Sequence, residues 1–348
     1  MSLSSYASEA LSSLSDAQLT FLQGLPKAEL HAHLNGSIPL DVLQEMARDY
    51  ISAHSSDLIP VSGVVQKGVE NLTKGVVLNE IHDFFGLFPA IYALTSSPAT
   101  VAKAARAVLE SFLDGSSPQC TYMELRSTPR ATDLMDRHGY LQAVLGEVER
   151  YPAGQAALIV SIDRRMDEAI AEECVNLAIT LKQQRRRVVG IDLCGDPLAG
   201  DLQRFVKHFQ KAKSCGLGVT VHIAETADNP ASETDDLLRA FAPSRLGHAT
   251  FLDQEAMRIV FEKDIAVEIC LTSNLLCKTV QSLEDHHIRF YLERNHAIAI
   301  CTDDQLPFRT NLTAEYALLL AKPPLGLGLT QDEVKKIAAM SLSRRFSQ

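Results

Sequence analysis

The hydrophobic pattern of the chain alternates between two kinds of segment. One kind is a short run, rich in apolar and β-branched residues, that ends abruptly in polar residues, which is typical of a buried β-strand. Eight such runs occur, at residues 28–34, 121–128, 157–163, 188–196, 219–225, 245–250, 266–274 and 297–304. Between most of them lie stretches with helical spacing, such as residues 167–184 and 201–216. The pattern therefore predicts alternating strands and helices.

The number of runs selects among the α/β folds. Eight buried strands, each followed by a helix, are expected for a closed (β/α)8 TIM-type barrel, which takes about 250 residues plus insertions. An open doubly wound sheet is the alternative, but its usual G-x-G-x-x-G after the first strand is absent. We find no repeat, low-complexity tract or linker, so we expect one barrel domain over residues 1–348.

The gap between the first and second runs, residues 35–120, is longer than a single helix needs. We expect a helical insertion between strands 1 and 2 that lies as a lid over the barrel mouth. Its most apolar part contains Phe84, Phe85 and Phe88. An equally open interpretation is that these rings pack an ordinary helix onto the core.

Composition narrows the class of protein. The chain of 348 residues is 46% hydrophobic and 22% charged, which excludes a disordered or collagen-like chain. No apolar stretch approaches the roughly 18 residues of a membrane helix, and the Ser-rich start lacks the features of a secretory signal. Seven cysteines without a C-x-x-C pair favour a reducing compartment. We therefore expect a cytoplasmic protein without a membrane partner.

Charge bears on possible partners. The net charge of -10 argues against a broad nucleic-acid-binding face, although a local basic pocket for one phosphate stays open. The basic run of Lys182 and residues 185–187 ends a predicted helix, where the helix dipole favours cations. We expect a small-molecule partner and no nucleic acid.

A set of metal-ligand residues recurs at the ends of the predicted strands. His31 and His33 are two residues apart on a strand, so both imidazoles lie on the same face. His222 and Asp303 lie near the ends of the fifth and eighth runs, so a barrel would bring all four to its mouth. Three nitrogens and one oxygen without sulfur suit Zn²⁺ with an open position for water. The alternative, three core histidines and an unrelated aspartate, needs four coincidences.

Three further polar residues, Glu225, His248 and Asp304, lie beside these ligands in the sequence. Glu225 could act as a proton shuttle to a bound substrate. His248 could orient an attacking water, and Asp304 could hold or deprotonate it. Each residue alone could have a surface or supporting role, but the set favours general acid–base catalysis.

Six motifs, LPKAELHAHLNGSI, GIDLCGDP, HIAE, RLGHAT, LTSN and TDD, occur in this order across about residues 25–310. In this arrangement the chain resembles the adenosine/AMP deaminase family of zinc hydrolases. The resemblance implies one zinc ion per chain, held by His31, His33, His222 and Asp303. It also implies that Glu225 protonates a purine ring nitrogen, that His248 and Asp304 handle the water, and that Gly195 contacts the purine. The implied reaction is hydrolytic deamination at C6 of a purine.

Asn35 is the informative departure within the first motif. The chain reads HLNGS, where family members that act on free nucleosides usually read HLDG and those that act on adenine usually read HLEG. A carboxylate there would repel a 5′-phosphate by about 4 kcal/mol per charge pair at 4 Å. Asparagine removes that charge. The motif ELRSTPR supplies hydrogen-bond donors for a phosphate, namely Arg126, Ser127, Thr128 and Arg130.

HLNGS, ELRSTPR and IDRR (residues 162–165) together resemble the adenosine-deaminase-like branch that acts on N6-methyl-AMP, releasing methylamine and leaving IMP. The likeness implies that the nucleotide site contains His33, Asn35, Thr128, Arg130, Asp163 and Gly195. For Arg126, bracing the barrel is an equally good interpretation. Three departures from the family pattern, Ala249, Tyr92 and residues 305–307, leave all implied ligands and catalytic groups in place.

Two other functions stay open on the sequence. One is an ordinary adenosine deaminase, which converts adenosine to inosine and ammonia. The other is a zinc-stabilised binding protein that has lost catalysis, against which the presence of Glu225, His248 and Asp304 argues. We expect a monomer, because most barrels need no partner.

Overall fold

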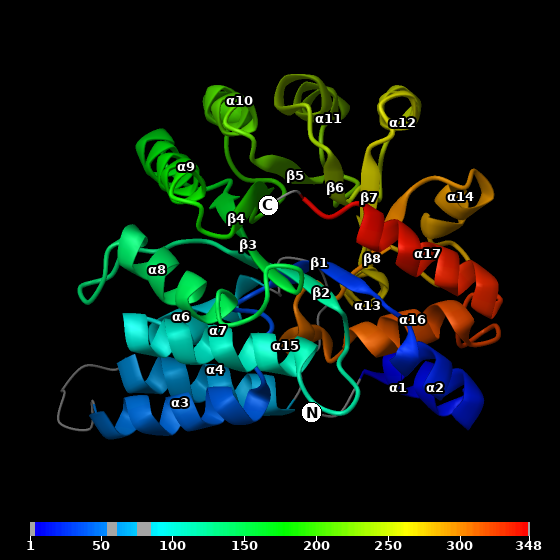
Figure 1. Cartoon of the computed structure of the whole chain (residues 1–348), viewed down its shortest axis with the longest axis horizontal. Coiled ribbons are helices and arrows are strands. Elements are labelled where there is room, and N and C mark those ends of the chain that lie inside the picture. Colours follow the sequence, from blue (N-terminus) through cyan, green and yellow to red (C-terminus); the bar gives the residue numbers. More distant parts are fainter. Residues whose placement is uncertain (1–3, 54–60, 75–84, 347–348) are drawn as a thin grey trace.

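The computed structural model describes residues 4–53, 61–74 and 85–346. Its eight strands form one parallel sheet in sequential order. They are β1 (Ala28–His33), β2 (Tyr122–Ser127), β3 (Ala156–Asp163), β4 (Val188–Cys194), β5 (Gly218–Ile223), β6 (Arg245–His248), β7 (Ala266–Ile269) and β8 (Ile298–Ile300). The sheet closes where Ala32 bridges Asp303 in parallel and the His33 N–H donates to the Asp303 carbonyl at 3.3 Å. The predicted (β/α)8 barrel is confirmed (Figure 1).

Helices surround the strands (Figure 1). They are α1 (Ser5–Ser12), α2 (Asp16–Gly24), α3 (Leu40–Ala53), α4 (Val61–Lys74), α6 (Phe88–Leu94), α7 (Pro98–Leu113), α8 (Arg137–Val148), α9 (Glu168–Gln183), η1 (Leu202–Phe205), α10 (Val206–Ser214), α11 (Ala231–Asp236), η2 (Leu237–Phe241), α12 (Gln254–Glu262), α13 (Leu271–Leu276), α14 (Ile288–Glu293), α15 (Gln305–Phe308), α16 (Leu312–Leu320) and α17 (Gln331–Ser343). None of those in the described part of the chain is both long and apolar enough to cross a membrane.

The strands read as continuous apolar runs because both of their faces are covered. All seven residues of β4 are buried, as are the first seven of the eight in β3. One face lies against the outer helices and the other faces the barrel interior, which leaves no solvent-facing side to alternate. This double burial explains why the strands were recognisable from the sequence.

The seventh predicted strand, residues 266–274, is shorter than expected, and this part of the prediction was wrong. β7 ends at Ile269, and Leu271 begins α13. The pairing with β8 also stops at Ile269, so no ladder partner is left for the residues that follow. The Thr272 N–H instead donates to the Glu315 carboxyl group at 3.2 Å, at the first turn of α13.

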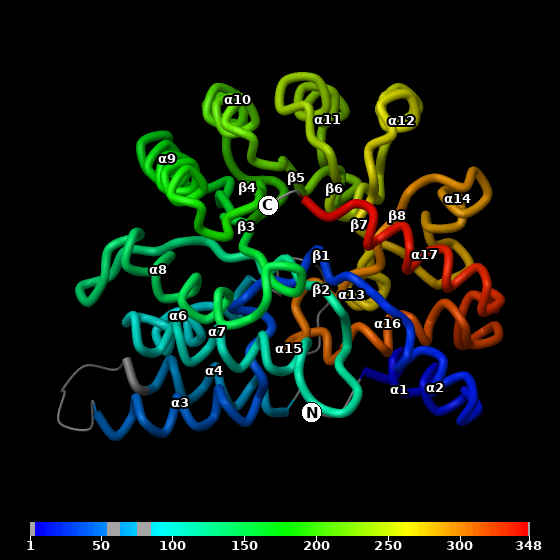
Figure 2. The backbone as a smooth tube through the Cα atoms, viewed as in Figure 1, coloured from blue at the N-terminus to red at the C-terminus, as the bar shows by residue number. Residues whose placement is uncertain are grey.

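The segment between β1 and β2 contains α3, α4, α6 and α7 in its described part. α7 packs against α8 and β2, as an outer helix of the barrel does, and begins with a capping box between Ser97 and Thr100. α3, α4 and α6 pack on one another on one side of the barrel (Figure 2). Phe84, one of the rings expected in the lid, lies outside the described residues.

The other end of the barrel is covered by the chain that follows α17. The red segment in Figure 1 runs from α17 to the centre of the strands. There the ring of Phe346 lies against β4 and β5, where Gly190 and Gly218 make room for it. A Cβ atom at these two glycines would lie 2.6 and 2.3 Å from the ring.

Candidate metal centre and substrate cavity

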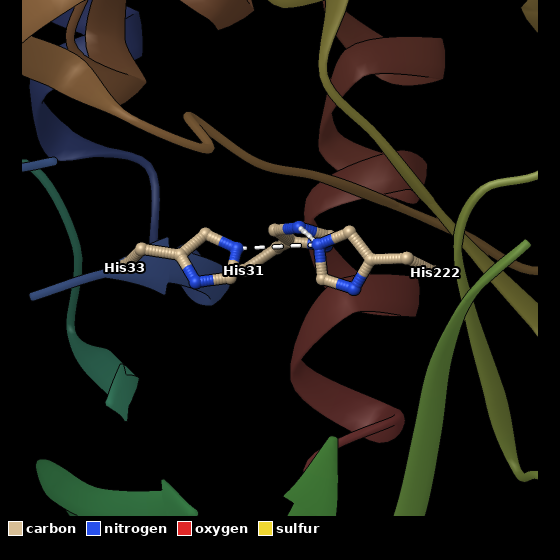
Figure 3. A group of neighbouring side chains, drawn as sticks. All are labelled: His31, His33 and His222. Atoms are coloured by element: carbon tan, nitrogen blue, oxygen red, sulfur yellow. Dashed lines mark hydrogen bonds between the residues drawn. The ribbon is translucent and has the colours of Figure 1, made fainter. Parts of the chain in front are cut away.

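Three imidazoles meet at the carboxyl ends of two strands (Figure 3). His31 and His33 come from β1, and His222 comes from β5. The His222 Nε2 lies 3.0 Å from the His31 Nε2 and 3.2 Å from the His33 Nε2. The Asp303 Oδ1 lies 3.9 and 3.7 Å from the same atoms of His31 and His33. The structure thus brings the four candidate ligands together.

Acceptors behind the rings fix how two of the histidines are turned. The His31 Nδ1 lies 2.7 Å from the Glu268 carboxylate. The His222 Nδ1 lies 2.9 Å from the Leu193 carbonyl and 3.1 Å from the Asp192 carboxylate. Because a carbonyl or a carboxylate only accepts, each Nδ1 carries a proton, and each Nε2 is directed toward the shared centre.

The charges of the rings also fit a cation at this centre. Burial, followed by the neighbouring His222, lowers the pKa of His33 to about 3, so this ring is neutral. Burial lowers the pKa of His222 too, but Asp192 outweighs it and the pKa is raised to about 9. The proton on its Nε2 then points between the other two rings. A divalent metal can replace that proton, and this N/O donor set fits the ion.

Backbone conformation around the centre is unusual for residues with side chains. His248, Ala249 and Asp303 have φ values of +62°, +49° and +59°. Such left-handed conformations cost of order 1 kcal/mol or more and cluster at functional sites. Gly247 contributes space, because a Cβ atom there would lie 2.7 Å from the His31 ring.

The three candidate catalytic residues face the same centre. The His248 Nε2 lies 3.7 Å from Glu225 and 3.9 Å from Asp303. Burial raises the pKa of Glu225 to about 7, although His222 opposes the shift. Burial and the nearby carboxyl groups of Asp303 and Glu225 raise the pKa of Asp304 well above its ordinary value. Glu225 can therefore hold a proton near neutral pH.

Two buried polar atoms at this centre lack a partner among the described residues. They are the His248 Nδ1 and the Asp304 Oδ1. Unsatisfied buried polar atoms are rare because they cost about 1–3 kcal/mol each. A polar ligand that approaches Asp304 can satisfy its free oxygen.

A cavity of about 670 Å³, measured to its open mouth, lies over the centre. Phe85, Phe88 and Tyr92 form an aromatic wall on the side of α6, and the histidines and carboxylates lie in the same cavity. The cavity therefore offers an apolar surface for a flat ring beside groups that can move protons.

Four of the candidate substrate residues besides His33 line this cavity, namely Asn35, Thr128, Asp163 and Gly195. Asn35 accepts a 3.4 Å hydrogen bond from the Thr95 hydroxyl through its Oδ1. Gly195 has φ of +100°, and a Cβ atom there would lie 2.6 Å from an Asp163 oxygen. Only glycine fits at that position.

Arg130 does not line the cavity, contrary to expectation. Its guanidinium group donates to the carbonyls of Tyr92 and Thr95 at 3.2 and 3.1 Å, and stacks 4.3 Å from the centre of the Tyr92 ring. These contacts bind it to the end of α6. The cavity wall instead contains Arg165, which pairs with Asp163 at 2.6 Å. Arg165 lies in the IDRR motif, which was the signal that could have identified it.

Arg126 lines the cavity floor, yet its charge is already paired. It is fully buried, contacts the Glu268 carboxylate, lies 3.3 Å from Asp192 and donates to the Leu30 carbonyl. Of the two interpretations left open, these contacts support the brace. The sequence did not identify Glu268 and Asp192 as residues that support the metal ligands. A single acidic residue inside an apolar strand was the available signal for each.

The departures at the rim have structural counterparts. Tyr92 contributes its ring to the cavity wall and stacks on Arg130. Residues 305–307 form most of α15, and the Gln305 side chain donates to Gln119 at 2.9 Å.

Comparison with known proteins places the chain. Residues 26–347 match the adenosine deaminase family model. The chain is 33% identical to the N6-mAMP deaminase of Arabidopsis thaliana, over 95% of each protein, and 32% identical to the human N6-methyl-AMP deaminase, over 94% of this chain and 90% of the human one.

Solved structures agree with the sequence comparison. A crystal structure of the Arabidopsis N6-mAMP deaminase has a TM-score of 0.81 and 34% identity, covering 94% of this chain and 96% of that one. The Arabidopsis ADAL complexed with IMP gives a TM-score of 0.80 at 34% identity, covering 94% of both chains. The chain therefore belongs to the adenosine deaminase family of hydrolytic deaminases.

Proposed function

We propose that this protein hydrolyses N6-methyl-AMP to IMP and methylamine. The observation that carries the proposal is that three histidine Nε2 atoms meet in the same cavity as the protonatable Glu225. The His222 Nε2 lies 3.0 Å from that of His31 and 3.2 Å from that of His33. Relatives named N6-methyl-AMP deaminase, over nearly the whole length, support the substrate. A related structure with IMP bound supports the product.

The metal in this proposal is Zn²⁺, one per chain, held by His31, His33, His222 and Asp303. The nitrogen-rich donor set without sulfur suits this ion. When bound, Zn²⁺ supplies Lewis-acid activation of water near neutral pH. Ser273 donates to the Asp303 Oδ2 at 2.8 Å, which leaves the Oδ1 directed to the histidines.

The protein side chains handle the protons. Glu225 donates a proton to the ring nitrogen N1 as C6 is attacked, and its raised pKa keeps that proton available. His248 and Asp304 hold the attacking water and accept its proton. The proton taken from the water passes to the leaving amine, the remaining proton of the C6 hydroxyl returns to Glu225, and the C6–N bond breaks to release methylamine. Gly195 positions the purine, because its bare backbone lets the ring approach closely.

Phosphate recognition in this proposal depends on Asn35, Thr128 and Arg165. Asn35 is uncharged where a carboxylate would repel the phosphate dianion. Arg165 gives the cavity wall an exposed cation, and Asp163 holds it in place. Arg130 acts indirectly, by holding the end of α6.

A substrate panel tests the proposal. Adenosine, AMP and N6-methyl-AMP would be compared side by side by the change in their ultraviolet absorption, with and without a chelator. We expect the highest kcat/KM for N6-methyl-AMP and no turnover after metal removal. A preference for adenosine would establish the ordinary deaminase instead, and metal binding without turnover of any 6-aminopurine would establish the silent binding protein.

We also propose that the enzyme is a cytoplasmic monomer. All seven cysteines are free, as a reducing compartment allows. Light scattering of the purified protein and fractionation of the source cells test the two statements separately.

A further inference from the structure

Buried charged side chains connect the candidate metal centre with the opposite end of the barrel. Glu268 on β7 is fully buried. One of its oxygens accepts from the His31 Nδ1 at 2.7 Å and from Arg126, and the other accepts from the Arg245 Nε at 2.7 Å. The orientation of Glu268, and with it the ring of His31, therefore depends on two arginines.

Arg126 ties the same carboxylate to a second histidine. It lies 3.3 Å from Asp192, whose carboxylate contacts the His222 Nδ1 at 3.1 Å. One network of buried charged side chains thus contacts both His31 on β1 and His222 on β5. Any change in the position of Glu268 can reach His31 directly and His222 through Arg126 and Asp192.

Arg245 is in turn held by the segment that follows α17. Its Nη1 donates to the Arg344 carbonyl at 2.9 Å, and its Nη2 donates to Glu124 at 2.6 Å. The ring of Phe346 lies under the guanidinium group, 3.6 Å from its central carbon. At this distance a cation and an aromatic face attract each other, more strongly when both are desolvated.

Phe346 has a seat built for it. Its backbone N–H donates to Glu124 at 2.7 Å, and its ring occupies the space left by Gly190 and Gly218. Both β4 and β5 have a glycine, and thus no side chain, at this point. The ring therefore enters the barrel from below and replaces side chains that the strands could have supplied themselves.

We propose that residues 344–346 are a positioning element for the metal centre. Phe346 and the Arg344 carbonyl hold Arg245, Arg245 holds Glu268, and Glu268 orients His31. The inference rests on the proposed metal site but not on the substrate. Phe346 is a positioning residue, since it lies at the end of the barrel opposite the cavity and touches no ligand.

The test is the affinity of the full-length protein for Zn²⁺, measured by competition with a chromophoric chelator well below the melting temperature. Loss of groups that orient metal ligands typically weakens metal binding 10–100-fold. Because Phe346 acts through two intermediates, we expect about tenfold weaker binding in Phe346→Ala, at the lower end of that range. Phe346→Tyr keeps the aromatic face, and we expect it to restore most of the affinity.

A matched control separates positioning from general stability. Phe209 on α10 is also a buried ring, and it packs on Phe241, outside the network. Phe209→Ala should lower the melting temperature without weakening Zn²⁺ binding. If Phe346→Ala does not fold, Phe346→Leu fills part of the seat without an aromatic face and should weaken binding several-fold.

Two results would overturn the inference. One is parental Zn²⁺ affinity in a folded Phe346→Ala or Phe346→Leu variant, and the other is an equal loss in Phe209→Ala. The visible spectrum of the Co²⁺ form gives a second readout, which should change in Phe346→Ala and not in Phe209→Ala. Both measurements need no substrate, so they stand even if the proposed deaminase activity fails.

Discussion

Glu225 lies beside the candidate metal centre, where it can protonate a bound purine. Replacing it with glutamine keeps the size and removes the proton donor. Because a positioned general acid contributes roughly 10²–10⁴-fold to a rate, we expect kcat for N6-methyl-AMP to fall by about that factor. Metal content, measured by atomic absorption, should stay at one ion per chain. Turnover within tenfold of the parent would remove Glu225 from this role.

The pKa of Glu225 also predicts the pH dependence of the reaction. Burial raises this pKa to about 7, and the acid form is the active one. The fraction protonated is nearly full well below pH 7 and falls about tenfold per pH unit above it. We expect kcat/KM to decline as pH rises through about 7, measured with metal content held constant. A rate that stays flat between pH 6 and 9 would contradict this assignment.

Asn35 sets the charge near the expected phosphate. Asn35→Asp places a carboxylate in the cavity, which at 4 Å and an effective dielectric constant of about 20 repels each phosphate charge by about 4 kcal/mol. We expect kcat/KM to fall by about 100-fold for N6-methyl-AMP and much less for N6-methyladenosine. Asn35→Ser removes the amide without adding charge and serves as the control. Equal losses on both substrates would show that Asn35 does not sense the phosphate.

At the scale of elements, Glu315 joins α16 to the start of α13. It is fully buried and accepts from the Thr310 hydroxyl at 2.6 Å and from the Thr272 N–H at 3.2 Å. Burial raises its pKa from 4.5 to about 7, although these hydrogen bonds oppose the shift. The folded state then keeps a proton that the unfolded chain loses near pH 4.5. This contribution to stability is complete below about pH 4.5 and is lost as pH rises through 7.

Glu315→Gln should remove that dependence on pH. The parent loses stability between pH 5 and pH 8 as Glu315 loses its proton, and the variant does not. We therefore expect the difference in free energy of unfolding, variant minus parent, to be roughly 2 kcal/mol larger at pH 8 than at pH 5. Urea denaturation at both pH values measures the difference. Glu293→Gln, at an exposed position, controls for the loss of one negative charge. If the free energy of unfolding changes equally with pH in the parent and in Glu315→Gln, Glu315 is not buried with a proton.

α13 also shows where local pattern stops being informative. The motif LTSN continues an apolar run, so its spacing predicts more strand. Whether a strand continues depends on pairing with a neighbouring strand, and the pairing of β7 with β8 stops at Ile269 and Ile300. The contact that starts the helix comes from Glu315, 43 residues further along the chain. Local spacing contains no information about such a partner.

For the whole molecule, the metal should connect distant parts of the barrel. Its candidate ligands come from β1, from β5 and from Asp303, which follows β8 and bridges to Ala32 of β1. An ion at 100 times its Kd stabilises the folded state by about 2.7 kcal/mol. Removal by a chelator should therefore lower the melting temperature by about 5 °C. Added Zn²⁺ should restore the melting temperature of the parent protein and leave the melting temperature of the His33→Asn variant unchanged. An equal melting temperature with and without chelator would argue against a tightly held ion.

The barrel and the grouping of His31, His33, His222 and Asp303 were predictable from the chain because they follow from local spacing. Alternation places two histidines on one face of β1, and parallel strands in a barrel bring their carboxyl ends to one rim. The membership of the cavity wall was not predictable. Arg130 and Arg165 look alike in sequence. In the fold, stacking on Tyr92 and hydrogen bonds to the Tyr92 and Thr95 carbonyls hold Arg130 outside the cavity wall, while Asp163 holds Arg165 in it.

The network from Phe346 through Arg245 and Glu268 to His31 was equally hidden. Its members lie far apart in the sequence. Glu268 and His31, which share one hydrogen bond, are 237 positions apart. Such contacts exist only after the barrel has closed and the segment after α17 has returned beneath it. Periodicity assigns a side chain to a face, but which groups meet across the interior depends on the packing of the complete fold.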